Sequence, residues 1–221
     1  MPRIVLISDT HNNHEYINVP GGDVLIHAGD ATNRGTEAEV EEFLIWYSQL
    51  PHRHKIYVAG NHDWLYEKEN RRARFLTAHY GITYLQDSFV EIEGLKIYGS
   101  PWQPRFFDWA FNLNRGAEIA EKWKLIPADI DVLITHGPPH GILDEVPRKF
   151  FVENTGCEEL RKRIEEIAVF GRLKLHVFGH IHCGYGTAES FGVKFINAAN
   201  CDEEYNPTQL PVVFELVTGD N

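Results

Sequence analysis

The sequence is poor in cysteine, in positive charge and in long apolar runs, and each shortage excludes a class of protein. The cysteines are an odd number at irregular spacing, which argues against a disulfide framework and favours a reducing compartment: Cys157, Cys183 and Cys201. The first apolar run is only IVLI at 4–7, too short for a secretion signal or a membrane span. We therefore expect a soluble, cytoplasmic protein without membrane contact.

Positive charge is outnumbered, with 21 lysines and arginines against 32 aspartates and glutamates and a formal net charge of −11. Broad binding to nucleic acid needs many cations opposite phosphates, so this balance argues against it. A locally positive metal site in an acidic protein can still attract a phosphate.

The remaining composition is that of a globular protein, with 43% hydrophobic and 24% charged residues in 221. A chain of this length can bury one large core. No Ser/Gly-rich linker, repeat or low-complexity stretch divides it, so we expect a single domain over residues 1–221.

Short apolar runs recur along the chain, each rich in β-branched or aromatic residues and without polar alternation. This pattern is typical of strands buried on both faces of a sheet. The runs are IVLI (4–7), DVLIHA (23–28), KIYVA (55–59), DVLIT (131–135) and LHVF (175–178).

Helical patterns lie between several of these runs. Residues 36–50 begin with Thr36 and Glu39 at capping-box spacing, and further helices are expected at 63–80 and 157–170. Residues 82–100 and 187–217 are typical of hairpin strands. Together these elements predict an α/β fold: a four-layer αββα sandwich of two mixed sheets flanked by helices.

Each apolar run is followed by side chains that can bind a metal. In such folds ligands bind beyond the carboxyl ends of the strands, so a sheet would bring these side chains together. Two carboxylates, one amide and four imidazoles are too many for one zinc but suit two first-row ions that share a carboxylate, with Mn, Fe or Zn expected. The seven residues are Asp9, His11, Asp30, Asn61, His136, His180 and His182.

Taken singly, these signals have ordinary alternatives. The pairs D-x-H and Gly-Asp occur in turns, and Asn61 in GNHD fits a β-turn. A histidine such as His136 after a strand is often a buried, hydrogen-bonded residue. His180 and His182 are a stronger signal, because alternation along a strand would point both to one face. All five signals in order, each after a buried run, favour a metal site.

The ordered set D-x-H (9–11), G-D (29–30), G-N-H-D (60–63), a histidine after a strand (His136) and G-H-x-H (179–182) resembles the calcineurin-like metallophosphoesterase superfamily. The segments GDVLIHAGD, GSPWQP, NLNRG, LIPADIDVLITHGPP, HVFGHIHCGYGT and INAANC are similar to its metallophosphoesterase-domain-containing branch. Studied members of that branch hydrolyse cyclic nucleotides, 2′,3′-cyclic ones included.

The resemblance implies a role for each residue. Asp9, His11 and His182 would hold a first metal ion. His136, His180 and Asn61 would hold a second, with Asp30 bridging the two. His62 would face the substrate phosphate, stabilise the transition state and protonate the leaving oxygen. Vertebrate relatives are known for glycine where His180 stands here, which weakens their second site.

For several residues outside this set the sequence allows two roles. Asp63 either orients His62 or caps the next helix, and we favour the cap. His140 either reaches the substrate or decorates a loop. We expect Cys183 to be inert. The stretch 100–112 contains four aromatic residues and an arginine that could contact a nucleotide: Trp102, Arg105, Phe106, Phe107 and Trp109. The alternative, which we favour for most of them, is that the aromatic residues pin a loop to the core.

The leading hypothesis is a dinuclear metal-dependent phosphodiesterase that acts on a small phosphodiester or nucleotide, with a metal-bridging hydroxide as the nucleophile. The alternatives are a phosphomonoesterase or nuclease on the same metal site, and a nucleotide-binding regulatory protein with slow turnover. The sequence leaves open whether the protein is a monomer or a homodimer.

Overall fold

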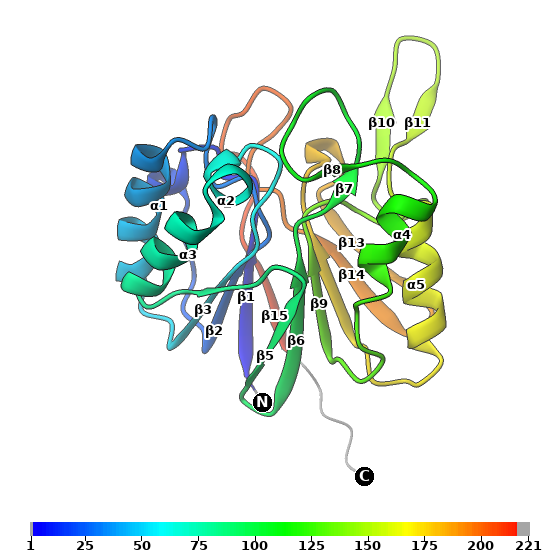
Figure 1. The fold of residues 1–221 in the computed structure, drawn as a ribbon, viewed down its shortest axis with the longest axis horizontal. Coiled ribbons are helices and arrows are strands. Elements are labelled where there is room, and N and C mark those ends of the chain that lie inside the picture. Colours follow the sequence, from blue (N-terminus) through cyan, green and yellow to red (C-terminus); the bar gives the residue numbers. More distant parts are fainter. Residues whose placement is uncertain (1, 216–221) are drawn as a thin grey trace.

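The computed structural model describes residues 2–215. In it, two β-sheets pack face to face, and helices cover the outer face of each sheet (Figure 1). This is the predicted αββα sandwich. The ends of the expected domain, residue 1 and residues 216–221, lie outside the described residues. Among the described residues, no helix combines the length and the apolar character needed to cross a membrane.

The first sheet has the order β15-β1-β2-β3-β4. Its strands are β1 (Arg3–Ile7), β2 (Val24–His27), β3 (His54–Tyr57), β4 (Thr83–Tyr84) and β15 (Val212–Glu215). The strands β1 to β4 are parallel, and β15 runs antiparallel to β1 at one edge. The carboxyl ends of the four parallel strands therefore lie along the same edge of this sheet.

The second sheet has the order β13-β14-β12-β9-β6-β5. Its strands are β5 (Ser88–Ile92), β6 (Leu95–Ser100), β9 (Val132–Thr135), β12 (Leu175–Phe178), β13 (Gly186–Ser190) and β14 (Val193–Asn197). The four middle strands are parallel, and β5 and β13 are antiparallel edges. Both sheets are thus mixed, with a parallel centre.

Helices α1 (Glu37–Gln49), α2 (Trp64–Lys68) and α3 (Asn70–His79) cover the first sheet, and α4 (Ala117–Trp123) and α5 (Glu158–Ala168) cover the second. The predicted capping box at the start of α1 is present, with Thr36 and Glu39 each bonded to the other's backbone. The shorter elements are η1 (His14–Tyr16), η2 (His182–Gly184), the pair β7 (Gln103–Pro104) and β8 (Asn112–Leu113), and the hairpin of β10 (Glu145–Pro147) and β11 (Val152–Asn154).

Consecutive residues of a central strand face two different cores. In β1, Ile4 and Leu6 pack between the sheets, whereas Val5 and Ile7 pack against the helices, and all four are fully buried. Because both faces of the strand are covered, both sets of side chains are apolar. This explains why the sequence runs show no polar alternation.

Two expectations about local structure are wrong in detail. The helix expected at 63–80 is interrupted at Glu69, whose backbone angles are φ −128° and ψ 49°. The side-chain amide of Asn70 donates to the carbonyl oxygen of Tyr66 at 2.7 Å, in the last turn of α2. The two resulting helices bury separate apolar residues, Leu65 and Tyr66 in α2 and Ala73 and Leu76 in α3.

The two expected hairpin regions are each divided between the sheets. In the first, β5 and β6 pair as predicted around Gly94, but β4 pairs in parallel with β3. In the second, β13 and β14 pair around Gly192, but β15 crosses to pair with β1. Short apolar runs carry no information about their partner strand, because pairing is decided by which sheet edge is free.

We expect Ile97→Ala to lower the free energy of unfolding by about 2–5 kcal/mol, because Ile97 is fully buried between the sheets and truncation leaves a cavity. The matched control is Ile45→Ala on the outer surface of α1, where 42% of the residue is exposed. That change should stay within about 0.5 kcal/mol. Urea unfolding of both variants measures the difference, and equal losses would contradict the assignment of the inter-sheet core.

Candidate metal centre

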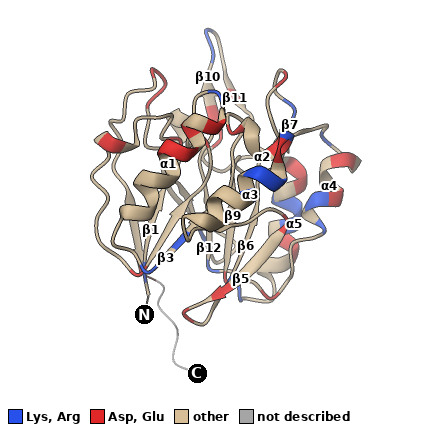
Figure 2. Ribbon diagram, turned by 60° about the vertical axis from the view of Figure 1, so that its left-hand side comes forward, with Lys and Arg blue, Asp and Glu red and all other residues tan. Residues whose placement is uncertain are grey.

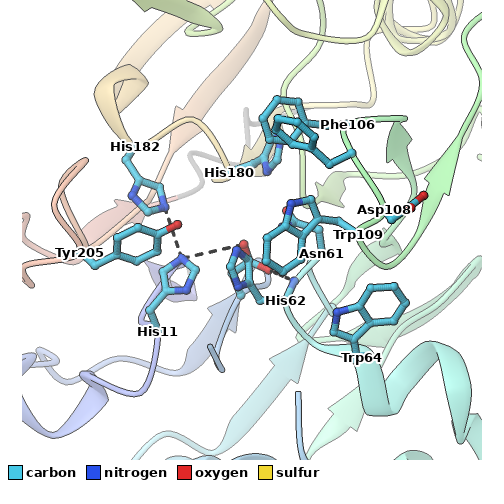
Figure 3. Close-up of a pocket in the computed structure, with 12 residues that line it drawn as sticks. His11, Asn61, His62, Trp64, Phe106, Asp108, Trp109, His180, His182 and Tyr205 are labelled. Carbon is cyan, nitrogen blue, oxygen red and sulfur yellow. Dashed lines mark hydrogen bonds and ion pairs between the residues drawn. The ribbon is translucent and has the colours of Figure 1, made fainter. Parts of the chain in front are cut away.

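The residues that follow five parallel strands meet in one place at the edge shared by the two sheets. The loops after β1, β2 and β3 come from the first sheet, and those after β9 and β12 come from the second. A bridge between Ser8 and Ala199 joins the two sheets beside this point. The cavity there has a volume of about 560 Å³ and is lined by His11, Asp30, Asn61, His62, Trp64, Phe106, Phe107, Asp108, Trp109, His180, His182 and Tyr205 (Figure 3).

All seven residues proposed as metal ligands lie at this point, in two neighbouring groups. Asp9, His11 and His182 offer ligand atoms within 4.8 Å of one another, and so do Asp30, His136 and His180. The side-chain oxygen of Asn61 lies 2.9 Å from Nε2 of His136.

Asp30 connects the two groups. Its Oδ2 atom is 3.2 Å from Nε2 of His136 on one side and 3.9 Å from Nε2 of His11 on the other. Together with His11 and His62 it forms a third set of three close ligand atoms. A carboxylate in this position can contact two cations at once.

Backbone carbonyls orient the histidine rings. In each of three rings Nδ1 faces a backbone carbonyl oxygen: His136 faces Ala28 at 3.0 Å, His182 faces Asp202 at 2.8 Å and His62 faces Asn33 at 2.8 Å. Because a carbonyl oxygen only accepts hydrogen bonds, Nδ1 carries the hydrogen in all three rings. The lone pair of each neutral ring is then on Nε2. Histidines that bind metals are typically held in this way by their other ring nitrogen.

The ring nitrogens of His11 and His182 in the first group face each other and the carboxylate of Asp9. Nε2 of His11 lies 3.3 Å from Nε2 of His182, which in turn lies 3.3 Å from Oδ1 of Asp9. Lone pairs that face one another in a buried site repel unless a proton or a cation lies between them. This donor set of imidazole and carboxylate groups fits a first-row transition-metal ion.

Burial and the two buried carboxylates shift the pKa values of the four histidines in opposite directions. Burial lowers the pKa of His11 to about 4 and that of His180 to about 3, so both rings are neutral at pH 7. Burial opposes the charged form of His136 and His182 too, but the hydrogen bonds and charges of Asp30 and Asp9 raise the pKa of each to about 9. A metal ion that binds here would displace these protons.

Asp9 and Asp30 stay ionised for the same reason. Burial alone would raise the pKa of Asp9, but the hydrogen bond from His182 and the charge of His136 hold it well below its usual range. The charges of His136 and His62 likewise outweigh burial and lower the pKa of Asp30. The site therefore keeps two buried carboxylates ready for cations.

The backbone is strained at the site. Four of the proposed ligands adopt the left-handed conformation that non-glycine residues rarely take, at a cost of about 1–3 kcal/mol each. They are Asp9 (φ 51°), His11 (φ 43°), Asp30 (φ 53°) and His180 (φ 67°). Backbone strain concentrated in this way is a feature of functional sites.

Glycine precedes three of the proposed ligands, and at two of these positions a carboxylate approaches the backbone closely. A Cβ atom on Gly60 would clash with Oδ1 of Asp30 and lie 2.7 Å from Cε1 of His136. A Cβ atom on Gly179 would clash with Oδ2 of Asp9 and lie 2.8 Å from Cβ of Ser8. The backbones of these loops pack directly on the carboxylates, and no side chain fits between them.

Asp63 has a different role from the helix cap that the sequence favoured. Although it precedes α2, its side chain makes no cap bond, and it is fully buried. Its oxygens accept hydrogen bonds from the backbone amides of Asp30 (2.9 Å), Gly60 (2.7 Å) and Thr32 (3.1 Å). In return, Oδ1 of Asp30 accepts from the amide of His62 at 2.7 Å. Two carboxylates thus lock the loops after β2 and β3 together.

The expectation that His180 and His182 alternate along one strand is also wrong. Strand β12 ends at Phe178, His180 lies in the following loop, and His182 begins η2. The left-handed turn at His180 sends the two rings to different groups, and the amide of His180 donates to both oxygens of Asp9 at 3.0 Å. The turn rather than strand periodicity brings both rings to the site.

The aromatic stretch at 100–112 divides in two. Trp102 packs against the apolar cores on the outer faces of the sheets, as expected, and its ring nitrogen donates to Asp87 at 2.9 Å. Phe106, Phe107 and Trp109 instead line the cavity, and the ring of Trp109 lies against His62 with 4.2 Å between centroids.

Two other residues singled out from the sequence lie outside the cavity lining. His140 lines a separate surface pocket with residues of α5. Cys183 is exposed, and its thiol donates to the carbonyl oxygen of Glu145.

Tyr205 is a site residue that the sequence did not suggest. Its ring packs edge-on against His11 and His182, with centroid distances of 4.7 and 5.3 Å, and lines the cavity (Figure 3). It lies in a loop ordered by Asp202, whose carboxylate accepts from the amides of Glu204 and Asn206 at 2.9 Å. No motif surrounds it, so only the fold of this loop identifies it.

Comparison with known proteins gives one family and several relatives. The family description "Calcineurin-like phosphoesterase" matches residues 2–184. "Metallophosphoesterase domain-containing protein 1" of Homo sapiens is 42% identical over 240 residues, covering 99% of this chain and 72% of its own. A UPF0046 protein of Caenorhabditis elegans is 38% identical over 226 residues, covering 97% and 75%.

Solved structures show the same fold at low identity. The crystal structure of TT1561 of Thermus thermophilus overlays with a TM-score of 0.56 at 15% identity, covering 89% of this chain and 88% of that one. The family match and the relatives lead to one conclusion: the chain belongs to the calcineurin-like phosphoesterases, a family of metal-dependent hydrolases of phosphoesters.

Proposed function

We propose that this protein is a dinuclear metal-dependent phosphodiesterase that hydrolyses small phosphodiesters, with cyclic nucleotides as the leading class. The observation that carries the proposal is the pair of histidine–carboxylate groups connected by Asp30, with His62 beside them in one cavity. The family membership supports phosphoester hydrolysis, and the two ligand groups support two metal ions.

The donors are nitrogen and oxygen atoms, which accept Mn, Fe or Zn. We propose that Asp9, His11 and His182 hold one ion, that His136, His180 and Asn61 hold the other, and that Asp30 bridges them. When bound, such a pair of ions supplies Lewis-acid charge to a phosphoryl group and lowers the pKa of water.

His62 is the proposed acid at the leaving group. Its Nδ1–H is committed to the carbonyl oxygen of Asn33, so Nε2 is the atom left for a ligand. The ring of Trp109 against one face restricts its rotation. As an imidazolium, His62 would stabilise charge on the phosphoryl oxygens and transfer the Nε2 proton to the leaving oxygen as the P–O bond breaks.

The cavity favours a small substrate with an aromatic group. Its volume of about 560 Å³ is that of a site for a small molecule. Phe106 and Phe107 are exposed at its rim, at 47% and 75%, where a nucleobase can stack on them. The net charge of −11 opposes a long polyanion as substrate.

Metal-loaded protein should hydrolyse bis(p-nitrophenyl) phosphate and lose that activity with a chelator, because the buried carboxylates and imidazoles act only through the ions. Asp30→Ala and His136→Ala should abolish turnover, since Asp30 contacts both ligand groups. The control is Asp129→Ala, whose carboxylate is 61% exposed and pairs with Lys96. Normal turnover in either site variant would refute the proposed metal centre.

His62→Ala should lower kcat by about 100- to 10,000-fold, the usual contribution of a general acid. Metal content measured by mass spectrometry should stay unchanged, because His62 is not one of the proposed ligands. His79→Ala, an exposed histidine on α3, is the control and should keep full activity. Loss of a metal ion together with activity would show instead that His62 is a ligand.

His180→Gly should cost the second metal ion and most of the activity while the first ion stays bound. Glycine keeps the amide that donates to Asp9 and adopts φ 67° readily, so the change removes the ring with little disturbance to the turn. Metal content per chain before and after the change measures the effect. Equal loss of both ions would contradict the division of ligands.

A further inference from the structure

A second cavity of about 390 Å³ adjoins the proposed metal centre and shares two of its walls, His180 and Phe106. Its other lining residues come largely from the β7–β8 segment and the β10–β11 hairpin, which project from the same end of the sheets (Figure 1). A ligand whose reacting phosphate lies at the metal centre can therefore extend past His180 into this second cavity.

Three arginines line this cavity: Arg105, Arg115 and Arg148. Among the described residues that line it, Glu153 is the one carboxylate. Such a local excess of positive charge is unusual in a chain with a net charge of −11. Figure 2 also shows positive charge at the tip of the β10–β11 hairpin, which forms part of the cavity wall. The cavity favours an anion despite the acidic protein around it.

Two of the arginines keep their charge available. Arg115 donates to the carbonyl oxygens of Thr155 and Gly156, both at 2.7 Å, which fix the guanidinium without neutralising it. Nε of Arg105 donates to the neutral amide of Asn114 at 3.2 Å. The nearest carboxylate of Arg105 is that of Asp108, 3.8 Å away and fully exposed to water. Screening by water weakens such a pair.

The third arginine is paired but remains within reach of a ligand. Arg148 contacts Glu153 at 2.7 Å, with side-chain exposures of 41% and 47%. The wall behind the arginines is preformed, because buried Asp144 accepts from the amide of Gly156 at 2.9 Å and from Nδ2 of Asn154 at 2.7 Å. Little ordering would be needed when an anion binds.

We propose that this arginine cavity binds a second phosphate on the substrate, separate from the phosphodiester that is cleaved. Guanidinium groups match phosphate oxygens in charge and geometry and hold them through paired N–H bonds. The substrate class is then a phosphodiester that also carries a phosphate monoester, such as a nucleotide with a cyclic phosphate at one end and a 5′-phosphate at the other. This inference rests on the proposed phosphodiesterase function.

The test compares adenosine 2′,3′-cyclic phosphate with the same nucleotide bearing a 5′-phosphate, on metal-loaded wild-type protein. The second phosphate should raise kcat/KM by about tenfold or more, as expected for charge-assisted hydrogen bonds. In the double variant Arg105→Gln/Arg148→Gln the two substrates should have nearly the same kcat/KM. Arg115 is left intact because it also supports the backbone.

Arg72→Gln is the matched control. Arg72 is also an exposed arginine paired with a carboxylate, that of Glu37, with side-chain exposures of 46% and 42%, but it lies on α3, away from both cavities. This variant should keep the wild-type preference for the phosphorylated substrate. Equal kcat/KM for both substrates in the wild type, or a preference that survives in the double variant, would overturn the proposal.

A binding measurement separates failure of this inference from failure of the proposed function. If neither substrate is hydrolysed, the phosphodiesterase proposal is wrong, and the arginine cavity is judged by calorimetry alone. Adenosine 3′,5′-bisphosphate should then bind about tenfold more tightly than adenosine 5′-phosphate, and the double variant should lose the difference. Equal affinities in the wild type would overturn the arginine site too.

Discussion

The contact between Asp30 and the histidines of the opposite sheet is the interaction on which the site depends. Asp30 follows β2 of the first sheet and is buried, so its charge needs partners that water cannot supply. His136, from the second sheet, lies 3.2 Å from its carboxylate. Nδ1 of His136 donates back to Ala28 of the first sheet. The same pairing of charges joins the sheets and brings the proposed metal ligands together.

The loops around Asp30 show how the scaffold holds this arrangement. Asp63 binds the amides of Asp30 and Gly60, and Asp30 binds the amide of His62, so the loops after β2 and β3 fix each other. On the other side of the site, the amide of His180 binds Asp9. Asp30 and Asp9 therefore each have a backbone partner as well as an imidazole partner. These bonds offset the left-handed backbone that the turns require.

Different parts of the chain form the proposed metal centre and the surrounding substrate-binding walls. The loops that directly follow the central strands supply the proposed ligands. The β7–β8 segment supplies the aromatic rim and Arg105, and the β10–β11 hairpin supplies Arg148; both project beyond the sheets. His180 and Phe106 lie where the two cavities meet.

The sequence by itself determined the buried strands, the order of the ligand motifs and the family. Both faces of each central strand are covered, so apolar runs identify these strands without knowledge of their neighbours. The motifs follow the runs directly, so their residue types could be read from local sequence.

Only the tertiary structure decided which strand pairs with which. It separated His180 from His182 by a left-handed turn, gave Asp63 a buried structural role in place of a cap, and brought Tyr205 and the arginines to the site. The physical reason is that these placements depend on contacts between residues far apart in the chain. Local periodicity and spacing carry no information about such contacts until the sheets have packed.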